Sequence, residues 1–225
     1  MLHTHLRMEG TWLIRAAAKR RGLDHRDRIL IRVKGAPRPT DEVELVGRDL
    51  GFVRLWPESQ YQQRTAHVGP DPLASDRDVP GRWHPTGRDE AITRLLARPD
   101  TVIGESLIDQ SILAGVGNEY RNEIAFLLGA NPWQPTRDVD PKQVVDLTAR
   151  VMRANLHRQH RVFTGHDAAG QRHFVFLRQG EPCRRCHGPI KYSRIGGGDS
   201  SAHRQAGRDR AIWWCPQCQS GTPRL

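Results

Sequence analysis

The sequence lacks the features of a secreted or membrane-embedded protein. Its 225 residues contain no apolar run close to the ~18 residues that a membrane span needs. The stretch from Met1 to Gly10 carries charged residues and histidines and no hydrophobic signal-peptide core. There is no internal repeat, and the run Gly196-Gly197-Gly198 is the one low-complexity feature. We therefore expect a globular, cytoplasmic chain of one or two domains.

Acidic residues are scarce relative to basic ones. The chain has 25 Asp and Glu against 35 Lys and Arg, a formal net charge of +10 at pH 7. Its 37% hydrophobic and 27% charged residues are typical of a folded chain and not of a disordered one. Arginine strongly outnumbers lysine, and the guanidinium fork matches the geometry of phosphate. This favours nucleic acid as the partner, and the alternative is a basic surface without a specific role.

Cysteine is also scarce, but its spacing is informative. Cys183 and Cys186 form one CxxC pair, Cys215 and Cys218 form a second, and 28 residues separate the two pairs. This pattern predicts a tetrahedral zinc site, the alternative being disulfides, which a cytosolic setting disfavours. Four thiolates leave no open position, so the zinc is expected to be structural. His187 is a competing ligand that we interpret as a surface residue.

Hydrophobic patterning divides the chain into a β-rich start and a helical middle. Residues 1–76 alternate in short strand-like runs, as at 29–33 and 52–55, which indicates part of an antiparallel β domain. Residues 77–90 are poor in apolar side chains and are predicted to be a linker.

Residues 91–170 show helical periodicity. We expect helices over 91–96, around 104–108, from Asn118 to a cap at Gly129, and from Pro141 after an Asp140 cap to about Leu156. Residues 171–222 begin with a strand-like HFVFL segment and contain all four cysteines.

A glycine-rich turn lies between two of these predicted helices. Gly115 and Gly117 allow the backbone to approach a ligand closely, and Asn118 stands where a helix N-cap belongs. The amides that follow suit an anion such as a DNA phosphate. By itself this pattern is also explained by Asn118 acting only as a helix cap.

Four segments together resemble the formamidopyrimidine-DNA glycosylase/endonuclease VIII family. The segment LIDQSILAGVGNEYRNE (107–123) is similar to its helix–two-turns–helix signature. FLRQGEPCRRC (176–186) with RAIWWCPQCQ (210–219) resembles its zinc-finger hairpin. HTHLRMEG (3–10) and AHVGPDPLASD (66–76) resemble parts of its N-terminal β domain. The arginine-rich character favours the endonuclease VIII side.

The resemblance implies a fold and a function. The fold is α+β and multidomain: an incomplete N-terminal antiparallel β-sandwich, a helix–two-turns–helix domain and a C-terminal zinc-finger β-hairpin. The implied function is base-excision repair by a bifunctional DNA glycosylase that removes oxidised bases and also cleaves abasic sites as a lyase. The implied partner is double-stranded DNA with oxidised bases or abasic sites, bound by a nucleoid-associated monomer that holds one structural Zn²⁺.

The resemblance also implies roles for individual residues. His5 and Asn118 would hold phosphates near the lesion, and Arg210 would grip the backbone at the flipped nucleotide. Met8 matches a side chain that fills the gap left by the everted base, and Arg48 and Leu50 accompany it. The ordinary alternatives are a strand histidine for His5, a core residue for Met8 and solvated charges for Arg48 and Arg210.

The family's catalytic residues are not found in this sequence. In the family, an N-terminal proline forms a Schiff base, assisted by the following glutamate and a β-turn lysine. This chain opens Met1-Leu2-His3, and Glu9 is not assigned as the acid, so we expect no catalytic residue within it. Either the start has been assigned too late, which we favour, or the chain is a catalytically inactive remnant that binds damaged DNA.

Two other function classes remain as alternatives. One is a non-catalytic nucleic-acid-binding module, and the other is a zinc-ribbon interaction protein, which would leave residues 1–160 unexplained.

Overall fold

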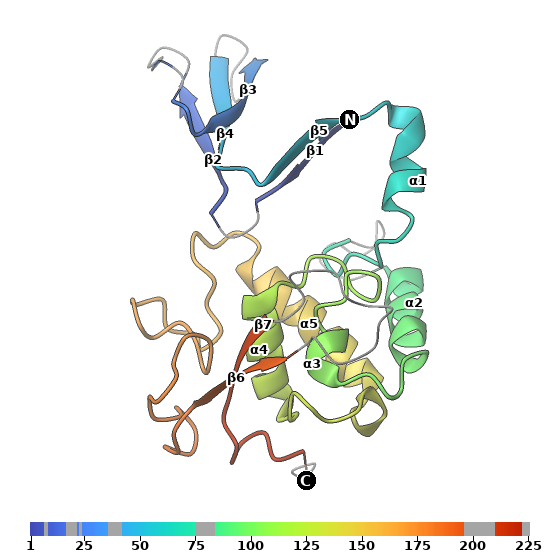
Figure 1. Ribbon diagram of the computed structural model, residues 1–225, viewed down its shortest axis with the longest axis vertical. Helices are drawn as coiled ribbons and strands as arrows, with labels where there is room; N and C mark the ends of the chain where they lie inside the picture. Colours follow the sequence, from blue (N-terminus) through green and yellow to red (C-terminus); the bar gives the residue numbers. More distant parts are fainter. Residues whose placement is uncertain are drawn as a thin grey trace. The chain divides into compact units, whose positions relative to one another are not determined.

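The computed structural model describes residues 1–6, 9–16, 22, 24–35, 42–74, 84–195 and 210–221. The chain forms two compact units, residues 1–66 and residues 67–225 (Figure 1). The first consists mainly of strands, and the second combines helices with a C-terminal hairpin. The predicted α+β class is therefore confirmed. Among the described helices, none has the length and apolar character required to cross a membrane.

The described residues of unit 1 form two antiparallel sheets. Strands β1 and β5 pair, and β4 lies between β2 and β3. Its elements are β1 (Leu2–His5), β2 (Thr11–Ala16), β3 (Asp27–Lys34), β4 (Glu42–Arg48), β5 (Phe52–Leu55), the short 3-10 helix η2 (Glu58–Gln60) and α1 (Tyr61–Thr65). The predicted alternating runs at 29–33 and 52–55 lie within β3 and β5. Such alternation is typical of strands, because successive residues of a strand face opposite sides.

The three-stranded sheet is held by a buried acid and by tight packing at its end. Glu44 is almost fully buried and accepts hydrogen bonds from Arg15 at 2.9 Å and Arg32 at 3.0 Å. Gly47 packs so closely that a Cβ there would lie 2.5 Å from the Leu50 side chain. Leu50 is fully buried, so a larger residue at position 47 would force the side chains packed there to shift.

Unit 2 is built from helices and one hairpin. Its elements are α2 (Pro85–Leu96), α3 (Ile103–Ser106), α4 (Asn118–Leu128), the short 3-10 helix η3 (Thr136–Asp138), α5 (Pro141–Asn155), β6 (Lys191–Ile195) and β7 (Arg210–Trp214). Gly129 caps α4 in the left-handed region with φ 70°, and Asp140 caps α5 by accepting from the Lys142 N–H. Both caps confirm the prediction.

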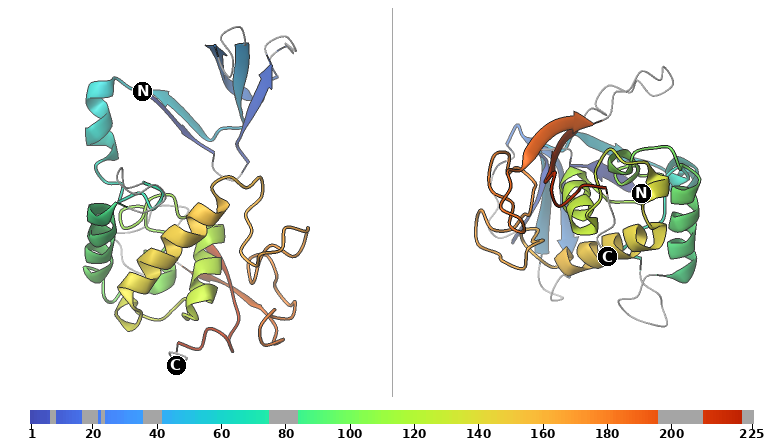
Figure 2. Two further views of the ribbon diagram at one scale, coloured as in Figure 1. Left: turned by 180° about the vertical axis from the view of Figure 1, so that it is seen from behind. Right: turned by 90° about the horizontal axis from the view of Figure 1, so that it is seen from below.

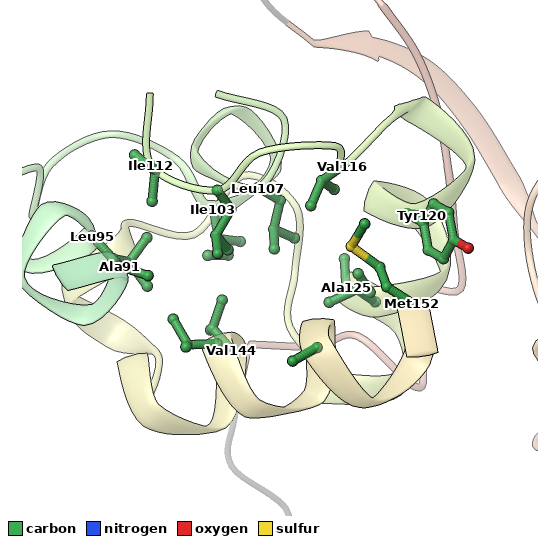
Figure 3. Close-up of a cluster of buried hydrophobic side chains, with 14 of the residues drawn as sticks. Ala91, Leu95, Ile103, Leu107, Ile112, Val116, Tyr120, Ala125, Val144 and Met152 are labelled. Carbon is green, nitrogen blue, oxygen red and sulfur yellow. The ribbon is translucent and has the colours of Figure 1, made fainter. Parts of the chain in front are cut away.

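Four helices surround the main hydrophobic core of unit 2 (Figure 3). Leu95 of α2, Ile103 of α3, Ile124 of α4 and Val144 of α5 are all fully buried. Removing a large aliphatic side chain of this kind from water stabilises a fold by about 1.5–3 kcal/mol. These helices therefore form the main hydrophobic core of unit 2.

Helix α4 is buried on nearly all sides. It contacts α5 on one side and β7 on the other (Figures 1 and 2). Phe126 belongs to a second cluster that includes Val175, Trp213 and the cysteines of the hairpin. Consequently Arg121, Asn122 and Glu123, three consecutive polar residues, are inside the protein and need internal partners.

The structure differs from the sequence-based expectation in two segments. The predicted strand-like segment at 173–177 is not a strand, because its amide groups bind the carboxylate of Glu123 and not a neighbouring strand. Helix α2 begins at Pro85, earlier than the expected 91, and so includes part of the predicted linker. Residues 75–83 of that region lie outside the described residues.

Candidate nucleic-acid interface and metal centre

The four cysteines converge at the base of the β6–β7 hairpin. Their sulfur atoms all lie within 4.8 Å of one another. Cys183 Sγ is 3.8 Å from Cys218 Sγ, and Cys186 Sγ is 3.3 Å from Cys215 Sγ. A tetrahedral zinc site with bonds of about 2.3 Å places its sulfurs about 3.8 Å apart. The four thiol groups are thus positioned to hold one metal ion.

Backbone and side-chain hydrogen bonds support both knuckles. The Cys183 N–H donates to Gly188 O at 2.8 Å. The buried Gln219 side chain accepts from the Cys215 N–H at 2.9 Å and donates to Ala130 O at 3.0 Å. The second knuckle is therefore fixed to the end of α4. His187 is exposed, as its surface interpretation requires.

The predicted glycine turn leads directly into α4. Gly115 has φ 81°, in the left-handed region, where a non-glycine residue would be strained. The residue at the N-cap position is Gly117, in an extended conformation, and no side chain caps the helix. Asn118 is the first helical residue, so the interpretation of Asn118 as the cap is wrong.

The Asn118 side chain is oriented by one contact from β7 and one from the next turn of its own helix. Its Nδ2 donates to Ala211 O of β7 at 3.1 Å, and its Oδ1 accepts from Arg121 Nη2 at 2.5 Å. Arg121 also donates to Ala211 O at 2.9 Å. Since Arg210 directly precedes Ala211, the structure places the backbone of the predicted hairpin arginine beside Asn118.

Arg121 and Asn122 attach the start of α4 to β7. The Arg121 guanidinium also donates to Gly104 O at 3.4 Å and to Arg210 O at 3.5 Å. Asn122 accepts from the Trp213 N–H at 2.7 Å and donates to Asn118 O at 2.7 Å. The side chain of Arg210 is exposed at the start of β7. This edge therefore combines an exposed cation, a helix N-terminus and a side-chain amide.

The remaining predicted site residues lie in unit 1. His5 is exposed at the end of β1. Arg48 donates from Nε to Asp27 at 3.0 Å, and Leu50 is fully buried. The placement of Arg48 and Leu50 favours structural roles within unit 1 over insertion into a duplex. Met8 lies outside the described residues.

Sequence reasoning missed Arg121, Glu119 and the cavity beside α4. A cavity of about 730 Å³ is lined in part by Glu119, Tyr120, Arg161 and His173. Glu119 accepts from Arg161 at 2.7 Å and pairs with His173 at 2.8 Å. Burial raises the pKa of Glu119, but these two partners outweigh it and hold that pKa below its ordinary value.

One signal could have identified Arg121 in advance. It lies three residues after Asn118 in a predicted helix, and residues three apart share one face. Nothing in the sequence indicates the segments, far along the chain, that contact this face.

Comparison with known proteins gives consistent matches over nearly the whole chain. It is 35% identical over 219 residues to the Mycobacterium tuberculosis protein named Endonuclease 8 2, covering 97% of this chain and 76% of that protein. It is 33% identical over 222 residues to the Mycolicibacterium smegmatis protein named DNA-(apurinic or apyrimidinic site) lyase Nei2, covering 98% and 76%. No profile of a protein family matches the chain.

A solved structure shares the fold. The formamidopyrimidine-DNA glycosylase of Lactococcus lactis, non-covalently bound to DNA containing an abasic site, matches with a TM-score of 0.65 at 21% identity. The match covers 97% of this chain and 74% of that one.

Proposed function

The chain belongs to the formamidopyrimidine-DNA glycosylase/endonuclease VIII family, and from this premise we propose that it acts in base-excision DNA repair. The proposed activity is that of a DNA glycosylase for oxidised bases with abasic-site lyase activity. The partner is double-stranded DNA that contains an oxidised base or an abasic site. The names of the relatives, endonuclease 8 and abasic-site lyase, support this activity.

The observation that carries the proposal is the joined edge formed by α4 and β7. The contact of Asn118 with Ala211 brings the start of a helix next to the strand that begins with Arg210. Helix N-termini and arginine side chains both favour phosphate oxygens, and phosphate contacts position a protein on a duplex. Asn118 and Arg210 are therefore the proposed phosphate ligands of unit 2. His5 is proposed to hold a further phosphate from unit 1, and Met8 to fill the gap left by the everted base.

The metal in the cysteine site is proposed to be one structural Zn²⁺. The four sulfur atoms fit its tetrahedral preference, and with four protein ligands the ion would have no position for substrate. Its contribution would be to hold the hairpin that presents Arg210. We accordingly propose that the DNA-binding helical domain runs to residue 170 and that residues 171–222 form the zinc-finger hairpin. The partial β domain, predicted as 1–76, precedes them, and residues 85–90 of the predicted linker 77–90 belong to α2.

The chemical step needs an amine nucleophile, and none is proposed among these 225 residues. A Schiff base at an N-terminal proline is the mechanism implied by the family resemblance. The alternative function is binding of damaged DNA without cleavage. Borohydride reduction distinguishes the two, since it traps a Schiff base between the protein and abasic-site DNA. We expect trapping by a chain extended upstream in frame and none by the 225-residue chain; trapping by the shorter chain would contradict our assignment of the nucleophile.

The DNA-binding part of the proposal is tested with an oligonucleotide duplex that carries one abasic-site analogue. Asn118→Ala should weaken binding by about 1–3 kcal/mol, because it removes a phosphate donor. Asn131→Ala is the matched control, since Asn131 is also partly buried and the described hydrogen bond of its side chain is one accepted from the nearby Trp133 N–H. Equal affinities of both variants and the parental chain in fluorescence anisotropy would remove Asn118 from the interface.

A further inference from the structure

Arg121 is a buried cation in unusual surroundings. Its side chain is 1% exposed, yet its described hydrogen-bond acceptors are all uncharged oxygens, three backbone carbonyls and the amide of Asn118. Its Nε atom is buried and has no hydrogen-bond partner. A buried charge normally has a counter-ion or is disfavoured, so this arrangement requires an explanation.

A second buried arginine in the same unit shows the usual arrangement. Arg178 is 7% exposed and donates to the carboxylate of Glu181 at 2.8 Å, in addition to two backbone carbonyls. Arg121 joins α4 to α3 and β7, whereas Arg178 bonds within residues 174–182. They differ in that only Arg178 has a carboxylate among its described hydrogen-bond partners.

The surroundings of Arg121 add further positive potential. Burial lowers the pKa of Arg121 to about 10, and the charge of Arg210 contributes to this shift. Glu105 opposes the shift through its charge, without a described hydrogen bond to Arg121. The guanidinium remains charged near neutral pH, and it lies one turn into α4, whose N-terminus also carries partial positive charge. In the free protein, the cations at this edge thus include a buried guanidinium with no carboxylate among its described hydrogen-bond partners.

We propose that Arg121 is a positioning residue for the DNA phosphate and that this phosphate is its counter-ion. Its bond to Asn118 Oδ1 fixes the amide so that one Nδ2 hydrogen points to Ala211 and the other remains for a ligand. When the phosphate binds, its charge offsets the buried guanidinium in a region of low dielectric constant. The inference rests on the proposed function, because it requires a DNA backbone at Asn118.

Arg121 should therefore contribute more to binding than to folding. Replacing it with a neutral residue removes an unfavourable buried charge from the free protein and a favourable interaction from the complex. A residue that served only to attach α4 to β7 would show the opposite balance. The salt dependence of binding separates the two roles, because each phosphate neutralised changes the slope of log K against log salt by about 0.9.

The experiment measures duplex binding by Arg121→Gln, Arg121→Lys and the matched control Arg178→Gln. Fluorescence anisotropy is recorded with an abasic-analogue duplex and an undamaged duplex from about 50 to about 200 mM salt. Circular dichroism melts show that each variant is folded at the assay temperature. We expect Arg121→Gln to weaken binding to both duplexes by about tenfold and to flatten the slope by about one. Arg121→Lys should keep most of the slope, and Arg178→Gln should keep all of it.

The inference is overturned if Arg121→Gln keeps the parental slope, whether or not its affinity falls. Failure of the proposed function has a different signature, namely a parental chain that binds the abasic duplex no more tightly than the undamaged one. If Arg121→Gln does not fold, the Nε–H resonance of Arg121 in the parental chain provides the test. It should shift on addition of undamaged duplex, and an unchanged resonance at saturation would refute the counter-ion role.

Discussion

The carboxylate of Glu123 offers the sharpest test of how the hairpin segment is attached to α4. Its Oε2 accepts from the Phe174 N–H at 2.8 Å, and its Oε1 accepts from the N–H groups of Val175 at 2.9 Å and Phe176 at 2.8 Å. Burial raises the pKa of Glu123, and the three amide donors oppose that rise. One fully buried side chain thus binds three consecutive amides that would otherwise lack partners.

Glu123→Gln should lower the free energy of unfolding of unit 2 by about 2–4 kcal/mol. The new NH₂ group faces an N–H donor, so one buried amide loses its acceptor at a cost of about 1–3 kcal/mol. The two remaining bonds become neutral ones, which are roughly half as strong as bonds to a charged group. The side-chain volume hardly changes, so cavity formation does not contribute.

The assay is urea unfolding combined with hydrogen exchange of peptides from α4 and residues 174–176, which reports on unit 2 alone. Glu90→Gln is the control, because Glu90 is an exposed acid whose pairing with Arg94 on α2 is expected to contribute less than about 1 kcal/mol. If both substitutions lower the free energy of unfolding equally, the three hydrogen bonds do not fix the segment. Packing such as the Phe126–Phe174 stack, with centroids 4.9 Å apart, would then account for it.

Two further predictions concern the metal and the cavity. Cys215→Ser should reduce the amount of bound metal, measured by atomic emission, and should increase hydrogen exchange in β6 and β7. The reason is that the hairpin is expected to depend on the fourth metal ligand. Full metal content with the hydrogen exchange of the parental chain would contradict the assignment. Because the pKa of Glu119 is lowered in the folded state, the stabilisation it provides is present near neutral pH and decreases as the pH falls through that lowered pKa. The difference in unfolding free energy between the parental chain and Glu119→Gln should therefore narrow from about pH 7 to about pH 3, and a constant difference would refute the ion pairing.

Local signals predicted much of the fold correctly. Asp140 and Pro141 define the start of α5, and Gly129 ends α4, because capping depends on a few adjacent residues. The cysteine spacing likewise predicted correctly that the four thiol groups lie together. The start of α2 was missed although Pro85 stands at a position that favours the first turn of a helix.

Long-range partners explain what local patterns could not predict. The segment 173–177 has the composition of a strand, but Glu123, about fifty residues earlier, supplies the acceptors for its amides. Asparagine is a residue type that often caps helices, yet the Asn118 side chain bonds to Ala211 and Arg121. The family resemblance implies that Leu50 reaches DNA. In the structure, the Leu50 side chain packs closely against Gly47 and is fully buried.

The three polar residues Arg121, Asn122 and Glu123 join the C-terminal region to the start of α4, which we propose to bind DNA. Each residue bonds to a different part of the C-terminal region: Arg121 to Ala211, Asn122 to the amide of Trp213, and Glu123 to residues 174–176. A solvent-exposed helix would need none of these bonds, whereas buried polar groups without partners are costly. Displacing the hairpin would therefore leave three neighbouring side chains unsatisfied and would release Asn118 from Ala211 in the same step. Because one carbonyl group serves both Arg121 and Asn118, the position of the proposed phosphate ligand cannot be independent of the position of the hairpin.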